Sequence, residues 1–255
     1  MARDVIGDPC RLSLAARDRQ AAERFYGAVL GWTFRNGGFG GVFSVAETGD
    51  VPVAGIGTVA AESALPVAWT PYFAADSADA AAERVRERGG TVAVGPVSFP
   101  VGGRAAVAAD REGAVFGVWD GDVLADGSVA SARAPARLEL HTGEAFDAAL
   151  FYGEVLGWGP GGGCCDTAYE EDQVVLRRRG RPVARLCGPV GRAAAKPRLR
   201  PRWMVPFRVP DPEEAVAHAL AAGGRTVPGH GNSHITLRDP AGCLSALDDA
   251  PTPDA

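Results

Sequence analysis

The sequence predicts an α+β fold made of two tandem domains, and three observations lead to this class. The stretch Phe-Tyr-Gly-Ala-Val-Leu-Gly-Trp at residues 25–32 returns at 151–158 with seven of its eight positions unchanged. A pattern of one strand, one helix and several short strands occurs four times along the chain. Residues 122–135 are small and polar without apolar periodicity, as expected of an interdomain linker. Internal repetition of this kind indicates a duplicated unit.

The predicted boundaries follow from the repeat and the linker. A chain of 255 residues is long enough for two domains of ordinary size. We expect a first domain at residues 1–121, the linker at 122–135, a second domain at 136–250 and a short tail at 251–255. Each domain would contain two βαβββ modules.

The repeated stretch is predicted to be the second half of an amphipathic helix and its exit. A strand is expected at residues 11–16, where leucines alternate with other residues. Asp18 fits a helix N-cap, because its carboxylate can accept hydrogen bonds from the first turn. Apolar residues then recur at helical spacing up to Leu30, and Gly31 fits the C-terminal stop.

The remaining elements follow from the same signals, which are period-two alternation for strands and Asp or Ser caps with Gly-Gly stops for helices. Either Asp76 or Ser77 would cap the second helix. In the first half, strands are expected at 33–35, 42–47, 51–59, 69–75, 91–94, 104–109 and 114–119, and a helix at 80–88. In the second half, strands are expected at 137–141, within 168–177 and 181–187, and at 203–209, 233–237 and 243–247, and helices at 146–155 and from Asp211 to Gly223.

Composition and charge exclude several classes of partner. A net charge of −5 disfavours a nucleic-acid partner, which requires a basic face. The N-terminus has no apolar run typical of a signal peptide, and no run of about 18 apolar residues could span a membrane. Five cysteines without Cys-x-x-Cys spacing favour a reduced chain without a zinc site. We expect a cytoplasmic protein, either a monomer with two packed domains or a homodimer.

Three features together resemble the vicinal oxygen chelate superfamily, the glyoxalase, bleomycin-resistance and extradiol-dioxygenase group. They are the strand that ends before Asp18, the helix that ends Phe-Tyr-x-x-Val-Leu-Gly-Trp, and the late Asp-Pro-x-Gly hairpin at residues 239–242. The resemblance covers nearly the whole chain, twice. It implies that the paired βαβββ modules of each domain form an open, curled mixed sheet around a cavity. It also implies that function depends on cavity residues more than on the fold.

Many members of this superfamily bind a divalent metal through His, Gln or Glu on inward-facing strand positions. The corresponding positions here are Arg11, Thr70 and Gly117 in the first domain and Arg137, Val205 and Ala246 in the second. None of these residues carries the imidazole or carboxylate that such metals require. We therefore expect neither the family metal nor another cofactor.

The first cavity is predicted to bind a planar or anionic small molecule. Because a strand alternates its faces, Arg11 and Ser13 would share the cavity with Tyr72 and Trp119. An aromatic ligand could stack on Tyr72 or Trp119 and accept a charge-assisted hydrogen bond from Arg11. Alternatively, Arg11 lies at the strand entrance and is solvated.

The second domain offers a more polar set of candidates. Arg137, Glu139 and His141 share one face of one predicted strand, and His234 lies on a later one. Glu139, His141 and His234 could act as general acids and bases, and Arg137 could hold an anion. The set could also be a displaced metal site. In the simplest alternative, Arg137 and Glu139 pair with each other and the histidines are solvated.

The expected function is that of a metal-independent small-molecule protein. It would sequester or modify an aromatic or otherwise hydrophobic metabolite, as resistance and secondary-metabolism members of the superfamily do. Modification would be an isomerisation, cyclisation or lyase-like proton transfer. Two alternatives remain: a metal-dependent lyase or dioxygenase with non-standard ligands from Glu139, His141, His230 or His234, and a binding module without catalysis.

Overall fold

The computed structural model describes most of the chain, with gaps at both termini and at several places between them. The described residues are 6–37, 41–58, 67–99, 102–121, 138–159, 165–170, 173–188, 200–228 and 234–249. Contacts between Cα atoms divide the chain into two units. The mid-chain unit consists of Met1–Cys10, Thr70–Ala130 and Arg137–Trp203, and the end-chain unit consists of Arg11–Trp69, Ser131–Ala136 and Met204–Ala255.

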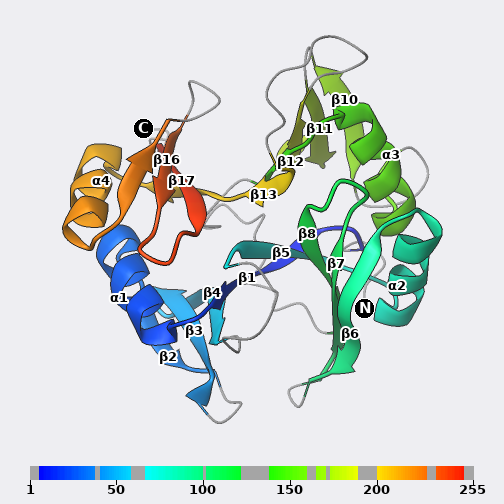
Figure 1. Ribbon diagram of the computed structural model, residues 1–255. Helices are drawn as coiled ribbons and strands as arrows, with labels where there is room; N and C mark the ends of the chain where they lie inside the picture. Colours follow the sequence, from blue (N-terminus) through cyan, green and yellow to red (C-terminus); the bar gives the residue numbers. More distant parts are fainter. Residues whose placement is uncertain are drawn as a thin grey trace. The chain divides into compact units, whose positions relative to one another are not determined.

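The mid-chain unit contains the second and third βαβββ modules (Figure 1). The second module has strand order β5-β8-β7-β6 and the third has β10-β11-β12-β9, with β13 added to its sheet beside β9. In each module the first strand runs parallel to the last, β5 to β8 and β9 to β12. The elements of this unit are β5 (Trp69–Ala74), α2 (Ala78–Glu87), β6 (Thr91–Ser98), β7 (Arg104–Ala109), β8 (Val115–Asp120), β9 (Leu138–His141), α3 (Ala145–Leu156), β10 (Asp166–Glu170), β11 (Gln173–Arg178), β12 (Arg181–Cys187) and β13 (Arg202–Met204).

The end-chain unit contains the first and fourth modules and repeats the same topology. Its strand orders are β2-β3-β4-β1 and β14-β17-β16-β15, with β1 parallel to β4 and β14 parallel to β17. Its elements are β1 (Pro9–Ala16), α1 (Arg19–Leu30), β2 (Thr33–Asn36), β3 (Phe43–Thr48), β4 (Val51–Thr58), β14 (Pro206–Val209), α4 (Pro212–Ala221), β15 (Arg225–Val227), β16 (Ile235–Arg238) and β17 (Leu244–Asp249). The predicted α+β class and the four modules are therefore confirmed.

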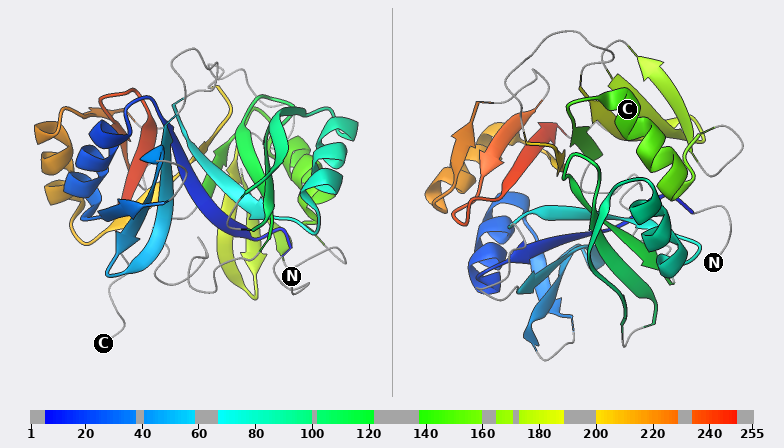
Figure 2. Two further views of the ribbon diagram at one scale, coloured as in Figure 1. Left: turned by 90° about the horizontal axis from the view of Figure 1, so that it is seen from below. Right: turned by 45° about the vertical axis from the view of Figure 1, so that its right-hand side comes forward.

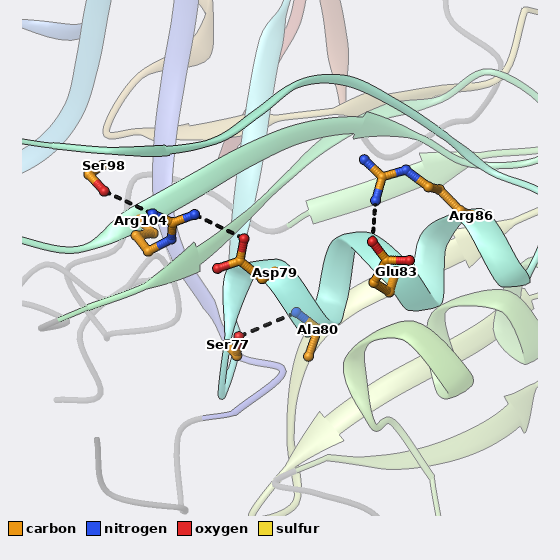
Figure 3. A network of polar contacts seen from close by, with 7 residues as sticks. All are labelled: Ser77, Asp79, Ala80, Glu83, Arg86, Ser98 and Arg104. Atoms are coloured by element: carbon orange, nitrogen blue, oxygen red, sulfur yellow. Dashed lines mark hydrogen bonds and ion pairs between the residues drawn. The ribbon is translucent and has the colours of Figure 1, made fainter.

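Local capping explains where the helices begin and end. The Asp18 carboxylate accepts a hydrogen bond from the Ala21 N–H at 2.9 Å, as predicted for an N-cap. Gly31 ends α1 in the left-handed conformation with φ 67°. Of the two candidates for α2, Ser77 is the cap, because its hydroxyl accepts a hydrogen bond from Ala80 N–H (Figure 3).

Helix pairing defines each unit. Helices α1 and α4 pack against each other in the end-chain unit, and α2 and α3 do so in the mid-chain unit (Figures 1 and 2). The phenylalanine of each repeated stretch contributes to this packing. A Cβ atom added at Gly224 would lie 2.7 Å from the ring of Phe25. A Cβ atom added at Gly90 would lie 3.0 Å from the ring of Phe151. The Gly-Gly pairs after α2 and α4 therefore make room for the repeated phenylalanines.

The structure groups module one with module four, and module two with module three. This grouping was not anticipated from the order of the modules in the chain. The domain boundary predicted at residues 122–135 lies outside the described residues, so it stays a prediction.

One predicted strand is divided in the structure. Residues 203–209 were expected to form a single strand, but β13 ends at Met204 and β14 begins at Pro206. Proline has no N–H and cannot donate to a strand ladder, so the hydrogen-bonded pairing changes at this point. The Val205 carbonyl instead accepts a hydrogen bond from Ala246 N–H at 3.1 Å.

A buried Trp–Tyr–Asp hydrogen-bond chain occurs once in each unit. In the mid-chain unit, the Trp203 indole N–H donates to the Tyr152 hydroxyl at 3.0 Å, which donates to Asp110 at 3.1 Å. In the end-chain unit, the same chain joins Trp69, Tyr26 and Asp239 at 3.0 and 3.1 Å. Each chain links the two modules of its unit, because the tyrosine and the aspartate come from different halves of the sequence.

Burial changes the acid–base properties of both aspartates. Desolvation raises the pKa of the Asp239 carboxyl above its ordinary value, although hydrogen bonds from the Cys243 N–H and the Tyr26 hydroxyl favour its charged form. The pKa of Asp110 is raised for the same reason. Desolvation also raises the pKa of the neighbouring Cys243 thiol to about 12, so this cysteine is expected to be chemically inert.

The raised pKa of Asp239 predicts a pH-dependent contribution to stability. The folded carboxyl keeps its proton to a higher pH than the unfolded one, whose pKa is about 3.9. Its stabilising contribution is therefore fully present below that pH and is lost as the pH rises through the folded pKa. The loss of unfolding free energy caused by Asp239→Asn should then be larger near pH 4 than at pH 7.

Urea unfolding of both proteins over a pH series measures this difference. The matched change Asp166→Asn, at an exposed position of β10, serves as the control. A difference for Asp239→Asn that grows with pH would show that the fold stabilises the charged carboxylate instead.

Candidate functional site

The most polar strand face in the mid-chain unit belongs to β9. Leu138 and Leu140 are fully buried, and Glu139 and His141 alternate with them on the opposite face. Glu139 is only 5% exposed, whereas His141 is half-buried. The His141 Nε2 atom lies 3.8 Å from the Glu139 carboxylate. The structure thus brings together two of the three predicted acid–base residues.

Two further polar residues join this pair from the neighbouring strand β12. In the parallel β12–β9 ladder, Arg185 lies beside Glu139, and Cys187 lies beside His141. Both Arg185 and Cys187 are half-buried. Helix α3 packs on β11 and β12 (Figure 1), and the alternating leucines of β9 indicate that the apolar face is the one it covers. The other face therefore carries a polar quartet: Glu139, His141, Arg185 and Cys187.

The first module has the same ladder with different side chains. There Ser13 lies beside Gly55, and Ala15 lies beside Gly57. Phe43 on the adjacent strand covers these glycines, since a Cβ at Gly55 would be 2.3 Å from its ring. The two copies therefore share one scaffold but differ at four adjacent positions, with small residues in the first module and the polar quartet in the third.

The residues predicted to bind ligand in the first domain fall into both units. Arg11 and Ser13 are half-buried on β1 of the end-chain unit, on the face opposite Leu12 and Leu14, as the alternation predicts. Arg11 is not at a solvated strand entrance. In the mid-chain unit, Trp119 is 4% exposed and belongs to an apolar cluster. Its other members are Cys10, Tyr72, Ala74, Phe99 and Ala105.

Tyr72 lies directly over a glycine in this cluster. Tyr72 and Gly117 are partners in the β5–β8 ladder, and a Cβ at Gly117 would be 2.2 Å from the tyrosine ring. The position that corresponds to a family metal ligand is therefore occupied by an aromatic ring.

The remaining candidates are not part of the quartet. His234 is half-buried just before β16 in the end-chain unit. Arg137 and His230 lie outside the described residues. Arg185 and Cys187 were not predicted as site residues. An alignment of the two repeats could have identified Arg185, because it aligns this arginine with Gly55 of the first repeat.

Two small pockets lie away from the quartet. One, of about 130 Å³, lies beside Arg19, Glu23 and Ser44 in the end-chain unit. The other, of about 220 Å³, lies between the Asp110–Gly113 turn and the start of α3 in the mid-chain unit. Neither contains a residue that the sequence analysis selected for ligand binding or catalysis.

Comparison with known proteins now defines the class. A family profile described as the Glyoxalase/Bleomycin resistance protein/Dioxygenase superfamily matches residues 10–118, and one described as a glyoxalase-like domain matches 137–246. The chain is 31% identical over 243 residues to the anthracycline biosynthesis protein DauV of Streptomyces sp. (strain C5), covering 88% of this chain and 85% of that protein. It is 30% identical over 240 residues to the anthracycline biosynthesis protein DnrV of Streptomyces peucetius, with the same coverage. The chain belongs to the Glyoxalase/Bleomycin resistance protein/Dioxygenase superfamily.

Solved structures show the same fold. The Mn(II)-bound glyoxalase from Novosphingobium aromaticivorans matches with a TM-score of 0.60 at 18% identity, covering 96% of this chain and 82% of that one. The 2,3-dioxygenase LapB from Pseudomonas sp. KL28 matches with a TM-score of 0.59 at 13% identity, covering 98% and 96%. The resemblance to the vicinal oxygen chelate superfamily is therefore confirmed as a statement about fold.

The residues at the family's metal positions do not fit a divalent metal. Gly117 has no side chain to donate a ligand atom, and Val205 and Ala246 are buried apolar residues. Thr70 has only a hydroxyl, a poor ligand beside the imidazole and carboxylate that such sites use. Elsewhere in the part of the chain with described structure, no group of three or more His, Cys, Asp or Glu side chains is arranged to hold a metal ion. None of the described helices is long and apolar enough to cross a membrane.

Proposed function

We propose that this chain binds an aromatic or hydrophobic metabolite at the polar quartet and modifies it by proton transfer without a metal. The observation that carries the proposal is the difference between the two repeats at four adjacent ladder positions. A scaffold kept in two copies does not need a buried carboxylate beside a histidine for folding, since the first copy has Ser13 and Ala15 there. Glu139 and His141 therefore have a role that the scaffold does not require.

The side chains present suit general acid–base chemistry. Imidazole exchanges protons near neutral pH, and a carboxylate a few ångströms away can orient it or act as its partner. Glu139 and His141 have this arrangement at 3.8 Å. Removal of a proton next to a carbonyl and its return at another atom would produce an isomerisation. In a cyclisation, the enolate carbon would instead attack a second carbonyl carbon of the same ligand, and the oxygen of that carbonyl would take up the proton. No step in this scheme needs a redox group.

The names of two relatives support the ligand class that we propose. DauV and DnrV are named for anthracycline biosynthesis, and the word anthracycline denotes a fused-ring aromatic compound. We propose a related ligand for this chain, a fused-ring aromatic ketone or quinone of secondary metabolism. Such a ligand would place its carbonyl oxygen beside the quartet and its rings on the apolar parts of the sheet.

A binding titration tests the proposal. We expect 1,8-dihydroxyanthraquinone to bind the wild-type protein, with a change in its visible absorption. The double substitution Glu139→Ser with His141→Ala, which gives the third module the residues of the first, should weaken binding. The matched change His218→Asn, at an exposed position of α4, should not. Equal binding by all three proteins would place the ligand elsewhere.

Metal analysis separates this proposal from the metal-dependent alternative. We expect purified protein to contain less than one equivalent of any transition metal and to keep its activity after chelation. A stoichiometric metal whose removal abolishes activity would overturn the metal-independent mechanism.

A further inference from the structure

We infer that Arg185 binds an anionic oxygen of the ligand, so that the protein selects aromatic anions over neutral aromatic compounds of the same shape. This inference rests on the proposed aromatic ligand and adds the charge of that ligand. Its basis is the state of the Arg185 guanidinium in the structure.

Within the described part of the chain, the Arg185 side chain forms no hydrogen bond or ion pair. Its Nε atom is buried and has no hydrogen-bond partner. Among the described residues, no ion pair joins Arg185 to Glu139 or to another carboxylate, although Glu139 is its neighbour in the ladder. A buried donor without a partner is unfavourable, because it has lost its hydrogen bond to water. A ligand oxygen at this position would remove that cost.

Other arginines of the same unit show what a structural role looks like. Arg104 also has a buried Nε, but its terminal nitrogens bind Asp79 at 2.9 Å and Ser98 at 3.0 Å (Figure 3). Arg177, on the strand next to Arg185, binds the Glu170 carboxylate at 2.6 Å. Each of these guanidinium groups fastens one element to another. Arg185 fastens no element of the described structure, and it projects from the same face as Glu139 and His141.

The chemistry of the guanidinium defines the ligand class. Arginine is always charged, and its planar set of N–H donors matches a carboxylate or a phenolate oxygen. The first module has Gly55 at the equivalent ladder position, so the scaffold itself does not need an arginine there. The ligand is therefore an aromatic compound that carries a carboxylate or an acidic phenol or enol, with that group placed at Arg185 beside the acid–base pair.

Two probes of equal shape test the inference. Anthraquinone-2-carboxylate is an anion, and anthraquinone-2-carboxamide is its neutral counterpart. Wild-type protein should bind the carboxylate about 10- to 100-fold more tightly, the range that a charge-assisted hydrogen bond provides. Arg185→Met should abolish this preference and leave the affinity for the carboxamide unchanged. Arg177→Met, which removes a paired arginine from the adjacent strand, should keep the preference.

The outcomes distinguish this inference from the proposed function. Equal binding of both probes by wild-type protein, or a preference that survives Arg185→Met, would overturn the role of Arg185 and leave the aromatic ligand in place. Failure of the wild-type protein to bind either probe would overturn both proposals. If Arg185→Met does not fold, Arg185→Lys replaces it in the test. Lysine retains the positive charge but lacks the planar set of N–H donors, so this variant should keep only part of the preference for the carboxylate.

Discussion

Replacing Tyr152 by Ala is expected to lower the free energy of unfolding by about 3–5 kcal/mol, and replacing it by Phe by about 1–3 kcal/mol. Tyr152 is fully buried, and its ring stacks on Trp158 with centroids 5.2 Å apart. It also meets Phe116 and Phe151 edge to face at 5.2 and 5.1 Å. Alanine would remove this packing and leave a cavity in the mid-chain unit.

The smaller change isolates the hydroxyl. Tyr152→Phe keeps the ring but leaves the Trp203 indole N–H without its acceptor and Asp110 without one donor. Both groups are buried, so neither can turn to water without a cost. Urea unfolding followed by tryptophan fluorescence measures both variants.

An exposed tyrosine of the same unit serves as the control. Tyr169 is 56% exposed, and Tyr169→Phe should change the free energy of unfolding by less than about 0.5 kcal/mol. If Tyr152→Phe were as stable as the wild type, the hydrogen-bond chain would be a by-product of ring packing. Tyr26→Phe should give the same loss of unfolding free energy in the end-chain unit, where the Tyr26 hydroxyl also accepts from a tryptophan and donates to an aspartate.

The helices and most strands could be predicted from sequence because their signals are local. Asp18 and Gly31 end α1 as expected, since a cap depends only on residues within one turn. The three-residue strand β15 was missed, because three residues carry too little periodicity to stand out. The strand at 203–209 was predicted as one element, and its residues from Trp203 to Phe207 are all apolar. Its division at Val205 depends on the partners of the two halves, which lie far away in sequence.

The pairing of modules could not be predicted, because the buried face of α1 resembles that of α3, with Phe and Tyr, and the buried faces of α2 and α4 both consist of small residues. What distinguishes the pairs is tertiary, namely the fit of Phe25 to Gly224 and of Phe151 to Gly90, and the tyrosine–aspartate bonds. The sequence did contain a hint of these bonds. Both halves repeat the tyrosine of the helix and the aspartate of the late turn, and we interpreted them separately, as a core helix and a hairpin.

The candidate site was half predicted. Glu139 and His141 are two residues apart, so strand alternation alone puts them on one face. Arg185 joins them through the β12–β9 register, which connects residues more than forty positions apart. That register follows from packing of Leu138, Leu140 and Leu186, and no local pattern contains it.

Replacing Glu139 by Gln is expected to slow catalysed proton transfer by about 10²–10⁴-fold, the usual contribution of a general acid or base. The expected rate loss for His141→Asn is of the same size, because the two groups act as a pair. Exchange of the acidic α-hydrogens of 2-tetralone in heavy water, followed by NMR, reports proton transfer without requiring the natural substrate. Wild-type protein should accelerate this exchange above the buffer rate.

Glu139→Gln and His141→Asn remove the acid–base groups but keep polar side chains in their place. Measurements on these two variants can therefore separate ligand binding from catalysis. Both variants should still bind 1,8-dihydroxyanthraquinone, since an amide side chain is polar and can still form hydrogen bonds at these positions. The exposed changes Glu83→Gln on α2 and His218→Asn on α4 should leave the exchange rate at the wild-type value. If both quartet variants exchange 2-tetralone as fast as the wild type while the dye still binds, Glu139 and His141 have no catalytic role. The side chains that distinguish the third module from the first would then serve to select the ligand, with Arg185 supplying the charge. The protein would act as a carrier.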